Sequence, residues 1–252
     1  MDIVAFIGAI VGVGLIYFGM LLEGGSLEQV IQITAALIVF GGTAGAVILS
    51  FPKEDFDTAF ALLGTVFFAS APKLEPLIKE IVEYAQKVRK EGVIILEKEA
   101  QRSSDPLLAM GLEAVADGAD PSLVKSMMET QLAQLEAKVN GGAKVWESAG
   151  GYAPTVGIVG AVIGLIQVMQ NLDDPAALGA GIAVAFVATI YGLIGANLYF
   201  IPISTRAKFK YQRVFTAKEL MIEGVLAIQA GESPAIIERK LSTYIIIGSK
   251  KK

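Results

Sequence analysis

The side chains that could bind an ion inside the longest apolar stretches of this 252-residue sequence are hydroxyls and amides. They are Gln32, Thr34, Thr43, Thr155, Gln167, Thr189 and Asn197, together with several tyrosines. None of these groups titrates near neutral pH, whereas a protein that moves protons or cations by itself normally places a carboxylate or basic group inside the bilayer. Either these stretches are purely structural, or another chain supplies the carboxylate.

The residues on which most enzymes depend are missing. The sequence has no His and no Cys, which excludes disulfides, thiol chemistry, the usual zinc sites and triads with an imidazole base. Nucleophile-elbow and phosphate-loop motifs are also absent. We therefore expect no enzyme, no metal and no cofactor, and the net charge of −4 argues against a nucleic-acid partner.

The composition is typical of a membrane protein. Hydrophobic residues make up 54% of the chain and charged residues 18%, against roughly a quarter charged in soluble domains. The mean hydropathy is +0.58. A lipid bilayer is thus the expected surrounding.

Four apolar runs without any Asp, Glu, Lys or Arg are each long enough to span a bilayer as a helix. They are Ile3–Leu22, Val30–Ser50, Ala149–Met169 and Ala176–Ser204. The predicted fold is an all-α polytopic membrane protein. Residues 1–50 and 148–204 hold two transmembrane helices each, 51–147 form a large helical cytoplasmic loop, and 205–252 form a helical cytoplasmic tail.

The basic residues predict the orientation. All 21 lie between Lys53 and Lys144 or from Arg206 onward, and none lies in the two short acidic connections between the paired spans. Because cytoplasmic segments are rich in Lys and Arg, we expect both termini and the large loop to be cytoplasmic.

Two apolar segments have alternative interpretations. Run one lacks the basic start of a cleaved signal peptide and is longer than a usual signal core, so a span is favoured. Residues 58–71 are short for a fifth span and are flanked by Lys53 and Lys73. A helix at the membrane interface, or one buried against its neighbours, is favoured there.

The loop and tail show helical periodicity and helix starts. Asp105-Pro106 and Asp120-Pro121 each pair an N-cap residue with proline at the first helical position, and the helix from Pro121 is long enough to run on toward span three. The last five residues, 248–252, are typical of an appended tail.

Small residues follow one face of spans three and four. They predict close packing against a partner helix and include Gly157, Gly160, Gly164, Ala185 and Gly192. Packing of the two spans on each other within one chain is the equal alternative. Pro154 and Pro202 are expected to kink the helix or free backbone carbonyls near the cytoplasmic interface, although simple helix termination also explains Pro202.

These features together resemble the A subunit of the bacterial flagellar stator, the MotA/PomA family, over essentially the whole chain. The segments that carry the resemblance are Gly24-Gly25-Ser26, Arg89–Glu97, Ala153–Gly160 and Gly224–Gly231. The resemblance implies a homo-oligomer, a pentamer around a dimer of a single-span B subunit (MotB/PomB-like) whose aspartate carries the ion. Proton or sodium flow would then drive torque on a FliG-like rotor switch protein from the bacterial inner membrane.

The resemblance also assigns roles to particular residues. Arg89, Lys90 and Glu97 match rotor-binding positions, and Pro154, Ala161, Thr189 and Pro202 match ion-pathway and gating positions. Ala161 and Ala188 stand where sodium-type members have threonines, which favours protons. Two alternatives stay open: an energiser of the TolQ/ExbB type, which typically has three spans, and a structural scaffold without ion flux.

Overall fold

The computed structural model describes residues 2–70, 72–170, 172–173 and 175–245. Residues 246–252, including the predicted appended tail, lie outside this range. Two compact units form: the apolar unit, residues 1–70 and 138–209, and the charged unit, residues 71–137 and 210–252. Every regular element among the described residues is helical, which confirms the all-α prediction.

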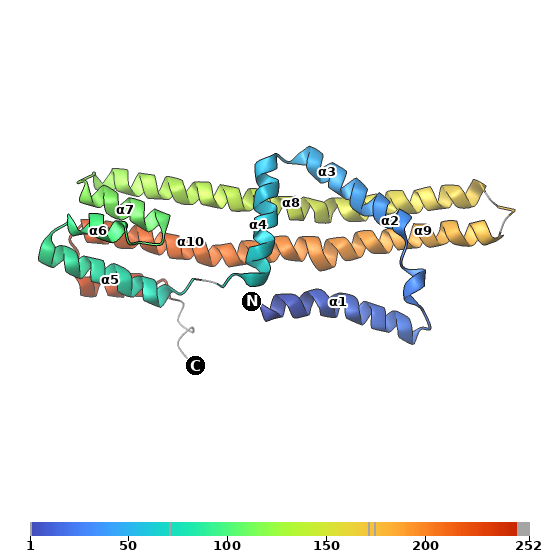
Figure 1. The fold of residues 1–252 in the computed structure, drawn as a ribbon, viewed down its shortest axis with the longest axis horizontal. Helices are drawn as coiled ribbons and strands as arrows, with labels where there is room; N and C mark the ends of the chain where they lie inside the picture. The colour runs from blue at the N-terminus through green and yellow to red at the C-terminus, as the bar shows by residue number, and fades with distance from the viewer. Residues whose placement is uncertain (1, 71, 171, 174, 246–252) are drawn as a thin grey trace. The chain divides into compact units, whose positions relative to one another are not determined.

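The apolar unit contains the four candidate membrane spans (Figure 1). Its elements are α1 (Ile3–Leu22), η1 (Leu27–Gln29), α2 (Ile33–Ala36), the π-helical η2 (Leu37–Gly41), α3 (Gly42–Ser50), α4 (Lys53–Phe68), α8 (Pro121–Gln170) from residue 138, α9 (Pro175–Ile194), the π-helical η3 (Gly195–Phe200) and the first residues of α10 (Ile201–Gln229). The bounds of α1 are those of the first apolar run. The second span starts at Ile33, three residues later than its run.

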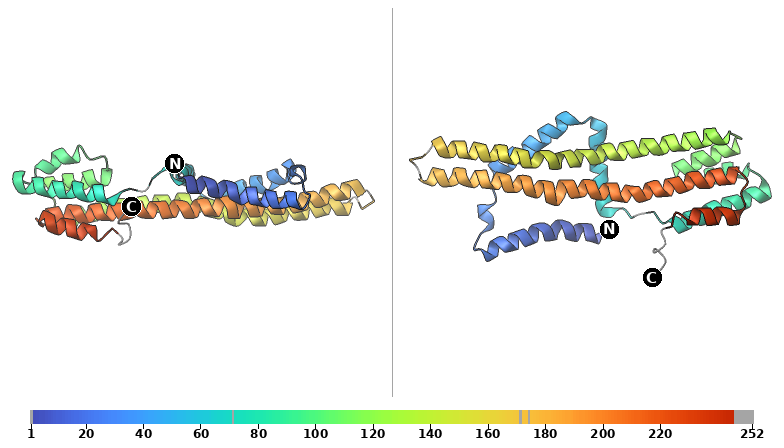
Figure 2. Two further views of the ribbon diagram at one scale, coloured as in Figure 1. Left: turned by 90° about the horizontal axis from the view of Figure 1, so that it is seen from below. Right: turned by 180° about the vertical axis from the view of Figure 1, so that it is seen from behind.

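Helix α4 runs across α8 rather than alongside it, as the views in Figures 1 and 2 agree. It buries one face, which comprises Thr58, Ala59, Leu62 and Val66. The indole Nε1 of Trp146 on α8 donates to the carbonyl of Ala59 over 2.8 Å, and the Trp146 ring contacts Phe60 and Phe200. Since α4 has 16 residues and buries its apolar face on other helices, it is packed as a crossing helix and is not among the candidate spans.

Pro202 lies inside a continuing helix, so the termination explanation is wrong. α10 begins at Ile201 and runs to Gln229. A proline cannot donate a hydrogen bond to the carbonyl four residues earlier and its ring crowds that carbonyl. The π-helical turn of η3, directly before Pro202, widens the helix at this point and accommodates the lost bond.

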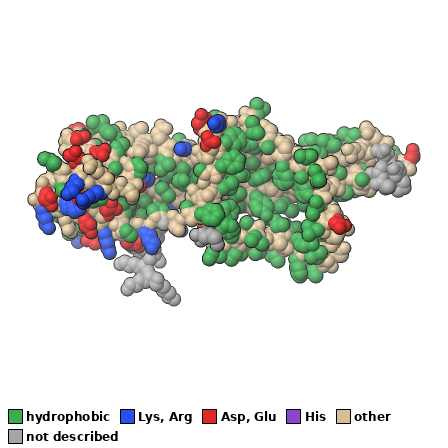
Figure 3. Space-filling model, viewed as in Figure 1, with side chains coloured by type: hydrophobic (Ala, Val, Ile, Leu, Met, Phe, Trp, Pro, Cys, Tyr) green, Lys and Arg blue, Asp and Glu red, His purple; other side chains and the backbone are tan. Residues whose placement is uncertain are grey.

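The charged unit packs six helical segments around one hydrophobic core. These are α5 (Leu74–Glu91), α6 (Ile95–Ala100), α7 (Pro106–Ala116), α8 up to residue 137, α10 from residue 210 and α11 (Pro234–Ser242). The core includes Ile81, Leu96, Leu112, Met128 and Leu220, all buried. In Figure 3 charged side chains gather over α5 to α7, whereas hydrophobic ones cover the visible face of the candidate spans.

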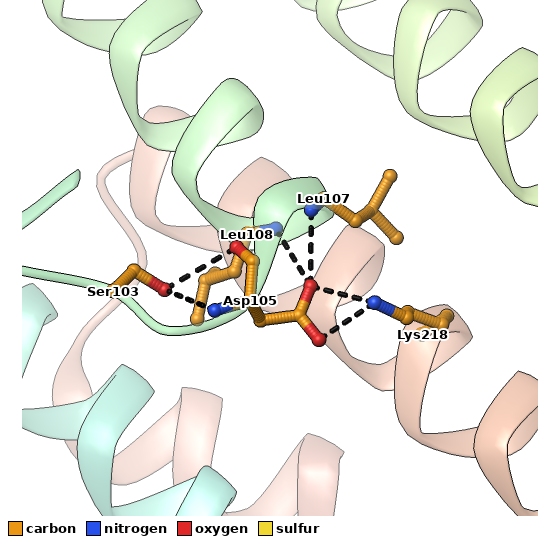
Figure 4. A network of polar contacts seen from close by, with 5 residues as sticks. All are labelled: Ser103, Asp105, Leu107, Leu108 and Lys218. Atoms are coloured by element: carbon orange, nitrogen blue, oxygen red, sulfur yellow. Dashed lines mark hydrogen bonds and ion pairs between the residues drawn. The ribbon is translucent and has the colours of Figure 1, made fainter. Parts of the chain in front are cut away.

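The predicted helix starts are present at both Asp-Pro pairs. The carboxylate of Asp105 accepts from the backbone N–H groups of Leu107 and Leu108, and both its oxygens accept from Lys218 Nζ on α10, at 2.7 and 2.6 Å (Figure 4). One residue thus caps α7 and ties it to α10. The helix that begins at Pro121 is continuous to Gln170, as expected from its length.

Candidate functional site

The small residues of α8 and α9 lie against each other. A Cβ added to Gly192 would stand 2.5 Å from the carbonyl oxygen of Ala153, and one on Gly157 would stand 2.9 Å from that of Ala188. On Gly164 it would meet the backbone nitrogen of Ala185 at 2.8 Å. Side chains cannot fit at these distances, so the two backbones approach as closely as glycine allows.

This contact between α8 and α9 is the alternative interpretation of the small residues, in which spans three and four pack on each other within one chain. Gly160 also lies in it, because its added Cβ would come within 2.7 Å of the Cβ of Ala188. Gly157, Gly160, Gly164, Ala185 and Gly192 are all buried in the chain itself. Their small size therefore does not require a partner helix, and the sequence could not decide this because a smooth helix face fits either neighbour equally well.

The predicted ion-path residues lie on α8, α9 and α10 and differ in their exposure. Thr189 is half-buried, and its hydroxyl donates to the carbonyl of Ala185 over 3.2 Å. Ala161 is half-buried, whereas Ala188 is fully buried in a cluster with Ala35 and Val39 of the second span. Pro154 is half-buried inside α8 and Pro202 is exposed. The residues that remain accessible are therefore available to a neighbouring chain.

Tyr191 on α9 binds non-helical backbone directly before the second span, at residues that the sequence analysis placed inside the span. Its hydroxyl donates to the carbonyl of Val30 over 2.6 Å and accepts from the N–H of Gln32 over 3.1 Å. These backbone groups belong to the residues between η1 and α2. Non-helical backbone in a membrane segment needs such partners, because lipid offers none.

The two π-helical turns meet next to this tyrosine. The ring of Phe40 in η2 stacks on Tyr191 with centroids 5.9 Å apart, and an added Cβ on Gly195 in η3 would lie 3.3 Å from Phe40. π-Helical turns carry one extra residue and occur often at functional sites. No sequence pattern announces them, since their residues are as apolar as the helices on either side.

In the charged unit, the three predicted rotor-binding residues stand around the junction of α5 and α6. Arg89 and Lys90 occupy the last turn of α5, Gly92 ends that helix with φ +81°, and Glu97 lies in α6. All three charged side chains are exposed. The turn at Gly92 favours glycine because other side chains rarely adopt this backbone conformation.

An ion pair between a buried carboxylate and a partly exposed ammonium joins α5 and α6 at this junction. Lys87 Nζ on α5 lies 2.9 Å from the carboxylate of Glu99 on α6, whose side chain is only 8% exposed. The same ammonium stands 5.8 Å from the centre of the Tyr84 ring, and the Tyr84 hydroxyl donates to Glu80 over 2.5 Å. Burial, followed by the bond to Glu80, raises the pKa of Tyr84. The sequence analysis did not single out Lys87 or Glu99, because a charged helical residue usually faces solvent.

Beside the junction lies a shallow depression with a volume of about 450 Å³. It is lined by Glu91, Ile94, Ile95, Glu97, Lys98 and Gln101. Val93 and Ile94 are exposed by 42% and 73% although both are large and apolar. The exposed surface of Arg89, Lys90, Val93, Ile94 and Glu97 is called the junction surface below.

A second ionic cluster lies on α8 and α10, just before the predicted third span. The carboxylate of Glu147 accepts from Lys144 Nζ over 2.8 Å and from Lys208 Nζ over 2.6 Å. These two hydrogen bonds lower the pKa of Glu147 to about 2. The carboxyl group of Glu147 therefore stays ionised near neutral pH.

Known proteins are similar to this chain over nearly its whole length. Residues 99–220 match the model of the MotA/TolQ/ExbB proton channel family. Motility protein A of Aquifex aeolicus (strain VF5) is 37% identical, with 97% of each chain covered.

Two solved structures are also similar. The structure of C. jejuni MotAB has a TM-score of 0.93 at 31% identity and covers 99% of this chain and 98% of that one. The flagellar MotAB stator complex from Bacillus subtilis has a TM-score of 0.87 at 33% identity, with 97% and 95% covered.

Proposed function

We propose, from the premise that this chain belongs to the motility protein A family, that it is the A subunit of a flagellar stator. Such a stator couples ion flow across the membrane to torque on the flagellar rotor. The chain is accordingly a bacterial inner-membrane protein with four candidate spans. The observation that carries this proposal is the likeness to motility proteins and stator complexes from end to end, at more than 30% identity.

The ion-carrying carboxylate comes from a B-type partner. This chain has no Asp, Glu, Lys or Arg in its four apolar runs, and the two similar structures are of MotA together with MotB. A carboxylate borrowed from a second chain supplies the titratable group that a proton or sodium path needs. A pentamer of this chain around two B subunits is the arrangement that the family resemblance favours.

Within that complex, we assign the exposed Pro202 and the half-buried Pro154, Ala161 and Thr189 to the ion path and its gating. Both termini and the large loop face the cytoplasm, because every Lys and Arg lies in the loop or in the tail. The junction surface then meets the rotor switch protein, with Arg89 and Lys90 on one side and Glu97 on the other.

The test is reconstruction of the complex. Co-expression with the B-type partner is expected to give a stable complex and to restore swimming to a strain that lacks both stator subunits. Subunits are then counted by native mass spectrometry. Failure to associate with any B-type partner, or a complex that never restores swimming, would exclude the proposal.

The coupling ion is tested separately. Ala161 and Ala188 replace the threonines of sodium-type members, so we expect protons to be the coupling ion. Swimming speed should then stay constant when sodium is varied at fixed pH. A speed that follows the sodium concentration would identify sodium coupling instead.

The TolQ/ExbB alternative is not favoured. Motility protein A of Aquifex aeolicus matches this chain along its length, and the described residues hold four candidate spans.

A further inference from the structure

We infer that the rotor contact has an apolar centre: the depression beside Ile94 receives one apolar side chain from the rotor switch protein. This inference rests on the proposed function and adds a binding site to the charges already assigned. It starts from two exposed residues, Val93 and Ile94, that the fold itself does not use.

The exposure of Ile94 has no structural explanation inside the charged unit. The following residues face the core: Leu96 is fully buried and Ile95 half-buried. Ile94 is 73% exposed at the turn after Gly92, where a polar residue would serve the fold equally well. An exposed large apolar side chain next to a depression marks an interaction site more often than one on a flat surface.

The surroundings of Ile94 specify the partner. Arg89 and Lys90 lie on the α5 side of the turn, where Glu91 lines the same depression as Ile94, and Glu97 and Lys98 line it on the α6 side. A complementary surface therefore carries an exposed apolar side chain surrounded by charges of both signs, with acidic groups opposite Arg89 and Lys90. Charges at the rim steer the encounter, whereas the apolar centre, once desolvated, holds the complex together.

The binding site is partly preformed. Lys87, whose side chain is 37% exposed, and the buried Glu99 join α5 to α6 through an ion pair, which helps to position the walls of the depression before the partner arrives. A preformed site loses less conformational entropy on binding than a flexible loop does.

The experiment measures the affinity of the purified stator complex for the rotor switch protein at low and at high salt. Ile94→Ser should weaken binding by about fivefold or more at both salt concentrations. Ile236→Ser is the matched control, because Ile236 in α11 of the same unit is 56% exposed and lies outside the junction surface. It should bind like the wild type. Arg89→Ala should weaken binding mainly at low salt, where surface charges are least screened.

Each outcome decides between the inference and the proposed function. If Ile94→Ser binds the rotor switch protein as tightly as the wild type does, the inference is overturned and the proposed function stands. If the wild type itself does not bind the rotor switch protein, the inference and the proposed function are both overturned. A changed subunit count in Ile94→Ser also overturns the inference, since the residue would then contact a neighbouring copy. Ile94→Thr, which keeps the branched shape, and Ile94→Leu, which keeps the apolar surface, separate loss of contact from misfolding: the first should bind weakly and the second normally.

Discussion

The side chain of Glu99 is only 8% exposed, and its ion pairs offset the free-energy cost of removing the carboxylate from water. Lys87 lies 2.9 Å away and Arg102 3.9 Å. Because Glu99→Gln removes the buried charge to which the partly exposed Lys87 and Arg102 bind, it should lower the free energy of unfolding by about 1–3 kcal/mol. Thermal unfolding followed by circular dichroism measures this.

The control for this prediction is an exposed pair on α8. Lys125 and Glu129 lie 3.8 Å apart with more than half of each side chain exposed. Pairs of this kind contribute little, so Glu129→Gln should change stability by less than about 0.5 kcal/mol. Equal effects of the two substitutions would show that the junction is not braced by Glu99.

Charge reversal at the junction surface tests the electrostatic part of the rotor contact. Arg89 and Glu97 are exposed, so Arg89→Glu or Glu97→Lys should leave folding and membrane insertion intact. Torque, measured as the rotation speed of tethered cells under high load, should fall because like charges now face each other across the contact. Lys79→Glu, an exposed reversal near the start of α5, is the control and should rotate normally. Normal torque in the Arg89→Glu/Glu97→Lys double variant would remove both residues from the contact.

At the scale of elements, glycines set the distance between the backbones of α8 and α9. Gly192→Ala would place a methyl group 2.5 Å from the carbonyl oxygen of Ala153, so the helices must move apart, at a cost of about 1–3 kcal/mol. Gly151→Ala on α8 is the matched control, since an added Cβ there meets nothing within 4 Å. It should be neutral or slightly stabilising, because alanine favours helix more than glycine does.

The melting temperature of the complex in detergent decides this prediction. If Gly192→Ala melts at the same temperature as Gly151→Ala, the two helices do not pack at this distance in the membrane.

The Glu147 cluster fixes α8 to α10 and has a definite pH dependence. The pKa of Glu147 is lowered from 4.5 to about 2 by Lys144 and Lys208, so the folded state holds the charged form more strongly than the unfolded state does. Its contribution to stability is complete above pH 4.5 and is lost as the pH falls toward 2. The melting-temperature difference between wild type and Glu147→Gln should therefore be constant from pH 7 to 5 and should shrink only below about pH 4.5. A difference that already changes between pH 7 and 6 would contradict this account.

The sequence predicted elements with strong local signals and missed those that depend on contacts. The run Ile3–Leu22 became a helix with the same bounds, and Asp105 caps α7 as its position before Pro106 indicated. The π-helical turns and the non-helical residues 30–32 before the second span were missed, because their partner Tyr191 lies some 160 positions later in the chain. Arg89 and Glu97 were identified only through family resemblance, since exposed charges on a helix are common.

For the whole molecule, the central prediction concerns conduction. This chain alone, reconstituted into vesicles, should pass neither protons nor sodium ions, because its apolar runs hold no Asp, Glu, Lys or Arg and their tyrosines do not titrate near neutral pH. Addition of the B-type partner should start ion flux, and neutralisation of the partner's intramembrane aspartate should abolish it. A pH-sensitive dye inside the vesicles measures the flux. Selective conduction by the chain alone would overturn the division of labour proposed for the complex.

The chain has a single tryptophan, Trp146, and it sits where α4 crosses α8 and where η3 leads into α10. Its indole is hydrogen-bonded and surrounded by rings, and the emission of such a group shifts with the polarity around it. The protein therefore carries an intrinsic fluorophore at this crossing. With a B-type partner that lacks tryptophan, all tryptophan fluorescence of the complex would come from Trp146. Spectra recorded with and without an ion gradient would report any rearrangement of the crossing, without a dye label or an added cysteine.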